Sequence, residues 1–206
     1  MRSHRAVREG RFSARGQSLS VELSGKTMLL VGYGQIGREV ARRARAFGLE
    51  IAVYDPYLNA IEADVRRFAA LDDALAHADI VSLHAPLTPE TRNILGAREL
   101  ALLPRNAIVV NASRGGLVNE EALAEAVASG AIHGAGLDTF DREPLPLSSP
   151  LIGQDRIVLS PHSAALTEGA LIAMGVKTVE NVLDGLDGRL DPQLVVNRTA
   201  MGGNRP

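Results

Sequence analysis

An arginine, a glutamate and a histidine in the second half of the chain are of types that hold carboxylates and move protons. Arg114 stands between an apolar run and two glycines, where a guanidinium can grip a carboxylate through two parallel hydrogen bonds. His162 follows another apolar run. Glu143 precedes His162 by 19 residues, which leaves room for one strand between them. A carboxylate bonded to an imidazole favours the charged ring and fixes its tautomer, as general acid–base catalysis requires. These residues predict acid–base chemistry on a molecule that carries a carboxylate.

Arg114 and His162 each also have a purely structural interpretation. Arg114 could pair with a surface acid, and His162 could be a hydrogen-bonded cap of a strand. His84 also ends an apolar run, on the same predicted edge of the fold. We prefer His162 as the acid–base because Glu143 accompanies it, and we place the other histidines elsewhere: His4, His77 and His133.

Residues 27–55 run from an apolar stretch through three glycines into a helical stretch and a second apolar stretch that stops at Asp55. Gly32 permits a tight turn, Gly34 lets the backbone approach a pyrophosphate, and Gly37 lets helix and strand pack closely. The helix N-terminus favours negative charge. Asp55 can accept both ribose hydroxyls of NAD, and it would repel the additional phosphate of NADP. The segment therefore predicts NAD binding.

Apolar runs of strand length alternate with helical stretches through most of the chain, which predicts βαβ units. The expected fold is α/β, a Rossmann-type doubly wound parallel sheet with helices on both faces. The expected strands are 27–32, 50–54, 65–68, 80–84, 107–111, 133–137 and 157–160. The expected helices are 35–47, 71–77, 96–103, 119–129 and 167–185, the last with one packed apolar face.

Ligands of an open parallel sheet bind outside the carboxyl ends of its strands. The polar residues that end the apolar runs should therefore gather on one edge, around one cofactor. They are the glycine turn, Asp55, His84, Ser113, Arg114, Asp138 and His162, with Glu143 in the loop after Asp138.

The composition excludes several classes of protein. The chain has 206 residues, 46% of them hydrophobic and 22% charged, which indicates a soluble globular protein with a full core. A net charge of −2 gives no general attraction to nucleic acid or membrane. Cysteine is absent, no metal-ligand spacing is found, and no apolar run reaches membrane-spanning length. We expect a cytoplasmic protein with no bound metal.

Residues 1–18 are rich in basic side chains, with five arginines against a single acid, Glu9. Such a segment could be an organelle transit peptide or an arm that binds nucleic acid. We prefer a solvated connector because Gly10 and Gly16 would break a helix.

From about Arg5 to Asn197 the chain resembles the D-isomer-specific 2-hydroxyacid dehydrogenases. Five segments occur in the order found in that family. They are Leu23-Ser-Gly-Lys-Thr, His84-Ala-Pro-Leu-Thr-Pro-Glu-Thr-Arg, Asn111-Ala-Ser-Arg-Gly-Gly-Leu-Val-Asn-Glu-Glu-Ala-Leu, Gly136-Leu-Asp-Thr-Phe-Asp-Arg-Glu-Pro-Leu and Ser160-Pro-His-Ser-Ala-Ala-Leu-Thr.

The resemblance implies a role for each residue of the site. Arg114 would orient the substrate, His162 would be the acid–base, and Glu143 would be its carboxylate partner. The implied reaction transfers a hydride between NADH and C2 of a 2-keto acid while His162 protonates the new alkoxide. The implied cofactor contacts are the glycine turn, backbone N–H groups of Gln35 and Ile36, Asp55 at the ribose, Ala112 and Asp138 near the nicotinamide, and Ser113.

The chain departs from the family mainly at its start, where members carry a substrate lobe before the point at which Met1 stands. We therefore expect a connector over 1–20, an NAD-binding domain over 21–166, and a helix and tail over 167–206 that would return to the missing lobe. The apolar face of that last helix would then be exposed or covered by a partner. Asn119 stands where aspartate is usual, and both residues cap helices.

The sequence leaves more than one function open. The first is an NAD-dependent oxidoreductase acting on a 2-hydroxy or 2-keto acid, with dimerisation through the NAD-binding domain implied by the resemblance. The second is a catalytically weak or inactive module that holds NAD as a sensor or corepressor does. The third is a fragment of a longer gene.

Overall fold

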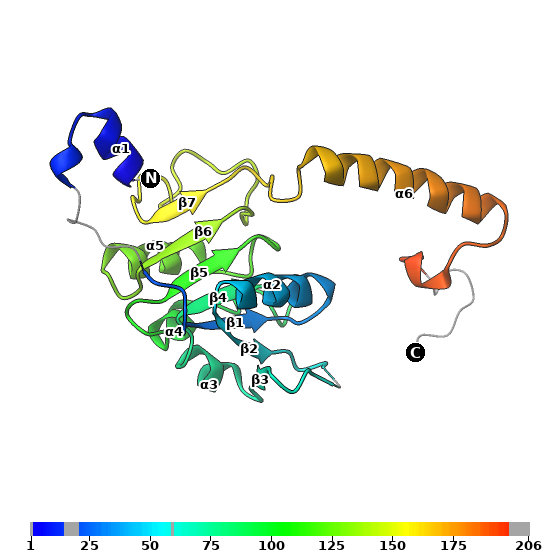
Figure 1. Cartoon of the computed structure of the whole chain (residues 1–206), viewed down its shortest axis with the longest axis horizontal. Helices are drawn as coiled ribbons and strands as arrows, with labels where there is room; N and C mark the ends of the chain where they lie inside the picture. Colours follow the sequence, from blue (N-terminus) through cyan, green and yellow to red (C-terminus); the bar gives the residue numbers. More distant parts are fainter. Residues whose placement is uncertain (1, 15–20, 59, 198–206) are drawn as a thin grey trace. The chain divides into compact units, whose positions relative to one another are not determined.

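The computed structural model describes residues 2–14, 21–58 and 60–197. Its centre is a seven-stranded sheet in the order β3-β2-β1-β4-β5-β6-β7, in which every pair of neighbours is parallel (Figure 1). The order runs outward from β1 in both directions, which is the doubly wound arrangement. The strands are β1 Thr27–Val31, β2 Glu50–Tyr54, β3 Arg66–Arg67, β4 Ile80–Leu83, β5 Ile108–Asn111, β6 Gly134–Leu137 and β7 Ile157–Leu159.

Helices cover both faces of the sheet, as its sequence predicts. Successive strand residues point to opposite faces, so Leu29 and Leu30 belong to two separate apolar clusters. The cluster of Leu29 packs against α3 (Leu71–Leu75), α4 (Ala97–Ala101) and α5 (Glu120–Ala128), and the cluster of Leu30 packs against α2 (Gln35–Ala46). The predicted fold class is therefore confirmed.

Element boundaries differ from prediction mainly at β3, the outermost strand of the sheet, and at the start of the chain. The predicted strand 65–68 shortens to the two residues of β3, because it is an edge strand that pairs only with β2. The first residues form a helix, α1 (Arg2–Arg8), and a 3₁₀ turn, η1 (Phe12–Ala14), within the segment interpreted as a connector. Gly10 has φ of 70° and follows α1, so this glycine ends a helix rather than preventing one. The connector prediction for residues 15–20 lies outside the described residues.

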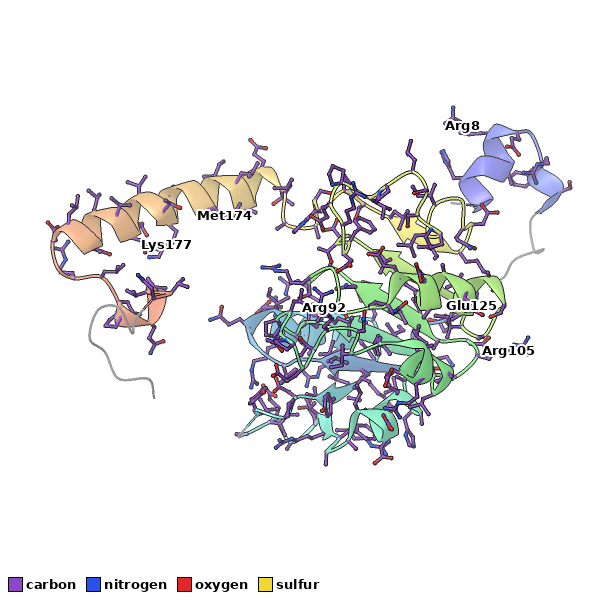
Figure 2. The ribbon with its side chains drawn as sticks, turned by 180° about the vertical axis from the view of Figure 1, so that it is seen from behind. Arg8, Arg92, Arg105, Glu125, Met174 and Lys177 are labelled. Atoms are coloured by element: carbon purple, nitrogen blue, oxygen red, sulfur yellow. The ribbon has the colours of Figure 1, made fainter. Side chains whose placement is uncertain are left out.

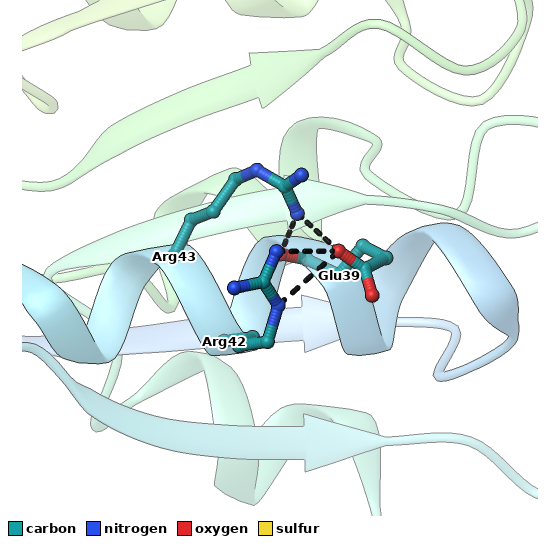
Figure 3. A network of polar contacts seen from close by, with 3 residues as sticks. All are labelled: Glu39, Arg42 and Arg43. Carbon is teal, nitrogen blue, oxygen red and sulfur yellow. Dashed lines mark hydrogen bonds and ion pairs between the residues drawn. The ribbon is translucent and has the colours of Figure 1, made fainter.

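The outer surface of α2 carries charged side chains in contact with water. Figure 3 shows Glu39 accepting hydrogen bonds from Arg42 and Arg43, one turn further along the helix. Exposed pairs of this kind contribute little to stability. They leave the opposite face of α2, with Ala41 and Ala44, to pack on the sheet.

The contacts divide the chain into two units, residues 1–162 and residues 163–206. The second unit contains α6 (Glu168–Leu186), on which Figure 2 labels Met174 and Lys177, and a 3₁₀ turn, η2 (Pro192–Leu194). The side chain of Thr167 caps α6 by accepting the N–H of Ala170 at 3.1 Å. No residue of α6 is buried, so the apolar face predicted for this helix is exposed in the described structure. Within the described ranges, no helix is both long and apolar enough to span a bilayer.

Candidate active site at the carboxyl edge of the sheet

The three glycines after β1 differ in the space around them. A methyl group added at Gly32, whose φ is 95°, would lie 2.8 Å from the carbonyl carbon of His84. A methyl group at Gly37 would lie 2.5 Å from the carbonyl oxygen of Gly32. Both glycines are therefore required by contacts within the protein. A methyl group at Gly34 would meet nothing within 4 Å, so this glycine keeps a space open beside the backbone.

The open space at Gly34 lies at the N-terminus of α2. Gly34 is the N-cap and offers no side-chain cap, so the first N–H groups of the helix, beginning with Gln35 and Ile36, are available to a ligand. Such N–H groups and the helix dipole favour a phosphate. The residues present therefore fit the pyrophosphate of a dinucleotide, and a side chain at Gly34 would fill the cradle.

Asp55 is held in place next to this turn. Its Oδ2 accepts the N–H of Tyr33 at 2.8 Å, and its Oδ1 accepts the N–H of Tyr57 at 3.0 Å. Tyr33 was not predicted as part of the site, because the contact depends on how β1 and β2 align. The carboxylate of Asp55 lines a cavity of about 440 Å³ with Pro56, Arg67, Phe68 and Ala69.

The structure brings His162 and Glu143 together. The Nδ1 atom of His162 lies 2.8 Å from Oε2 of Glu143, and the other carboxylate oxygen accepts the N–H of Phe140 at 3.0 Å. His162 has φ of 50°, and its N–H donates to the carbonyl of Asp138 at 2.8 Å. Because a carboxylate only accepts, Nδ1 carries the proton of this bond and Nε2 is left for a substrate.

The hydrogen bond from His162, followed by that from the Phe140 N–H, lowers the pKa of Glu143 below its usual value. Glu143 is therefore ionised at neutral pH and accepts the hydrogen bond of Nδ1. The side chains of His162 and Glu143 are 52% and 38% exposed, so the pair remains open to a ligand.

The pair lines a cavity of about 690 Å³. The other lining residues are Ser160 and five apolar residues: Phe140, Pro144, Leu145, Leu159 and Pro161. The sequence did not predict this wall, because its residues come from the loop after β6 and from the end of β7 with the loop that follows it. An apolar wall beside the charged Glu143 excludes water and strengthens the electrostatic interactions near it.

Arg114 lies in a loop that is held by hydrogen bonds of the neighbouring residues Asn111 and Ser113. The buried side chain of Asn111 donates to the carbonyl of Arg114 at 2.8 Å and accepts the N–H of Ser113 at 3.1 Å. The Ser113 hydroxyl donates to the carbonyl of Ala85 at 3.0 Å. The guanidinium of Arg114 donates to the carbonyl of Ser113 at 2.7 Å and, among the described residues, pairs with no carboxylate.

Gly115 connects this loop to the loop that carries Glu143. A methyl group at Gly115 would lie 1.8 Å from the carbonyl oxygen of Phe140, so only glycine permits this approach. Asp141, in the loop that carries Glu143, also forms an ion pair at 3.0 Å with Arg92, which lies between β4 and α4. Figure 2 labels Arg92.

The remaining predicted cofactor residues lie at the ends of β5 and β6. Ala112 is exposed directly after β5, whereas Asp138 is buried after β6. The hydroxyl of Ser160 donates to Oδ1 of Asp138, a contact that the sequence did not predict. In the part of the chain that the structure describes, no group of three His, Cys, Asp or Glu residues is arranged to hold a metal ion.

His84 lies on the same edge, with its Nε2 atom 3.0 Å from the hydroxyl of Ser82. Burial lowers the pKa of His84 from its ordinary 6.5, because a charged ring is poorly solvated there. The folded chain thus binds this proton less readily than the unfolded chain. We expect the free energy of unfolding to be greatest above pH 6.5 and to fall as the pH drops below that value.

Urea unfolding across this pH range measures the effect. The His84→Gln variant should show a flatter dependence on pH than the unmodified chain, and His77→Gln, at an exposed ring bonded to the Asp73 carbonyl, should not. Equal pH dependence in all three proteins would refute this account of His84.

Comparison with known proteins identifies the scaffold. The family model described as D-isomer specific 2-hydroxyacid dehydrogenase, NAD binding domain, matches residues 1–164. The chain belongs to this family. The D-2-hydroxyacid dehydrogenase relatives include D-3-phosphoglycerate dehydrogenase of Methanocaldococcus jannaschii, 43% identical over 178 residues that make up 85% of this chain and 34% of the relative. Glyoxylate reductase of Korarchaeum cryptofilum is 38% identical and is covered to 59% of its length, by 93% of this chain.

Solved structures of the D-2-hydroxyacid dehydrogenase family have the same fold. D-lactate dehydrogenase with NAD⁺ from Lactobacillus jensenii superposes with a TM-score of 0.84 at 31% identity, over 95% of this chain and 63% of the other. The chain spans between 34% and 59% of the length of the two curated relatives named above. Membership of the family establishes the NAD-binding domain, and it is the basis for a proposal about activity.

Proposed function

We propose that this chain is the NAD-binding and acid–base part of an NAD-dependent D-2-hydroxyacid dehydrogenase. The observation that carries the proposal is the bond of 2.8 Å between His162 and Glu143 on the same sheet edge as the open space at Gly34. The substrate is a 2-hydroxy acid or its 2-keto acid. Arg114 has no carboxylate partner among the described residues and is available for the carboxylate of such a substrate.

The chain's own residues account for the proton. NADH, when bound, supplies the hydride that reduces C2 of the keto acid. His162 donates its Nε2 proton to the substrate oxygen, and the ionised Glu143 stabilises the charged ring before transfer. In the opposite direction, Nε2 accepts the hydroxyl proton. Arg114 holds the carboxylate, so that C2 is presented in one orientation.

The proposal also includes the domain organisation of the chain and its location in the cell. We place the NAD-binding domain at residues 21–166, between a connector over 1–20 and a segment over 167–206 that returns to a substrate lobe. A homodimer formed through the NAD-binding domain is part of this proposal. The absence of cysteine is compatible with a protein of the reducing cytoplasm, where disulfides do not form.

Turnover separates a dehydrogenase from a module that only holds NAD. With the full chain and NADH, we expect oxidation of NADH on addition of glyoxylate, hydroxypyruvate or phosphohydroxypyruvate. The loss of NADH absorbance measures this oxidation. Saturable binding of NADH without turnover of any of these acids would support the binding module instead. The absence of NADH binding would refute both.

A further inference from the structure

Arg67 lines the same cavity as Asp55, the residue predicted to contact the adenosine ribose. In the register of β2 and β3, Arg67 is paired with Val53. Val53 points to the α2 face of the sheet, where it belongs to the cluster of Leu30. Asp55 is two residues beyond Val53, and side chains alternate along a strand. Arg67 and Asp55 therefore share one face, and both line the cavity of about 440 Å³.

Arg66, the preceding residue, points to the other face. It is paired with Ala52, and its guanidinium lies over the ring of Phe68 at 4.4 Å. Ala52 and Phe68 both belong to the cluster of Leu29, on the face opposite α2. Two adjacent arginines thus have the same charge and different surroundings, and only Arg67 lines the cavity with Asp55.

Two arginines of α2 already have acidic partners. Arg38 of α2 pairs with Glu62, and Arg45 pairs with Asp64 at 3.0 Å. For Arg67, the structure shows no carboxylate partner among the residues it describes. Arg67 is exposed and positively charged at the place where the ribose hydroxyls meet Asp55.

We infer that Arg67 is a latent binding site for the 2′-phosphate of NADP, which Asp55 keeps closed. The inference rests on the proposed function, since it assumes that the adenosine ribose binds at Asp55. The Asp55 carboxylate accepts the ribose hydroxyls of NAD and repels a phosphate. Removal of that charge leaves Arg67 to donate charge-assisted hydrogen bonds to the phosphate.

Calorimetric titration with NADPH tests the inference by binding alone. Asp55→Asn should bind NADPH about tenfold more tightly than the unmodified chain, because one charge-assisted hydrogen bond to phosphate has about this effect. Asp55→Asn combined with Arg67→Ala should lose that gain. Asp55→Asn combined with Arg66→Ala should keep it, since Arg66 carries the same charge on the opposite face of the sheet.

Equal NADPH affinity of the two double variants would overturn the assignment to Arg67. A titration of the unmodified chain with NADH distinguishes this failure from failure of the proposed function. If NADH binds and the double variants are equal, only the Arg67 site is wrong. If NADH does not bind, the proposed function fails and the Arg67 site fails with it.

Discussion

Replacement of His162 by asparagine is expected to lower kcat for reduction of a 2-keto acid by about 10²- to 10⁴-fold, the usual contribution of a general acid. The affinity for NADH should be unchanged, because His162 lies in the cavity with Glu143 and not at the glycine turn. Asparagine keeps a polar group at this position and removes the proton donor on Nε2. Steady-state turnover and NADH titration measure the two quantities separately.

Two further variants show whether the effect belongs to this histidine. His133→Asn changes a ring just before β6, at the opposite edge of the sheet, and should leave kcat within about twofold. Glu143→Gln retains a hydrogen-bond acceptor for Nδ1 without its charge and should lower kcat less than His162→Asn does. If His162→Asn and His133→Asn had the same kcat, His162 would not be the acid.

Replacement of Gly115 by alanine is expected to destabilise the fold by about 3 kcal/mol or more, at the upper end of the range for overpacking. The added methyl group would lie 1.8 Å from the Phe140 carbonyl oxygen and 2.6 Å from the Asp141 nitrogen. Both atoms belong to the backbone, so no side-chain rotation relieves the contact. The loop with Glu143 must then move, and the bond to His162 should be lost with it. Thermal or urea unfolding measures the change in stability.

Gly34→Ala is the matched control for Gly115→Ala. A methyl group at Gly34 meets nothing within 4 Å, so this variant should unfold at the same urea concentration as the unmodified chain. Its affinity for NADH should fall strongly, because the methyl group occupies the space left for the pyrophosphate. Equal stability of Gly115→Ala and Gly34→Ala would show that the close approach at Gly115 is not required.

The sequence predicted the sheet well because its signals are local. Buried parallel strands form continuous apolar runs, and the three glycines fix where β1 ends and α2 begins. Asn119 illustrates the same point, since its side chain accepts the N–H of Ala122 at 2.9 Å and caps α5. The two-residue strand β3 and the helix α1 were less predictable, because neither has a clear local pattern of apolar residues.

The candidate site was only partly predictable, because its contacts join distant loops. The edge rule for parallel sheets placed His162 and Glu143 on one side, and the structure shows that they touch. Three contacts had no sequence signal: Tyr33 to Asp55, Ser160 to Asp138, and Gly115 against Phe140. Each depends on the relative positions of loops that follow different strands. Gly116 also has a positive φ, of 78°, and a methyl group added there would lie 3.0 Å from Nη1 of Arg92 and from Oδ1 of Asp141.

A single-turnover reaction tests the central claim most directly. The full chain, in excess over NADH, is mixed rapidly with glyoxylate or hydroxypyruvate, and the absorbance of bound NADH is followed. The account predicts a first-order loss of NADH in the unmodified chain and a loss slower by about 10²- to 10⁴-fold in His162→Asn. Equal rates in the two proteins, or bound NADH that is stable with every keto acid, would contradict it.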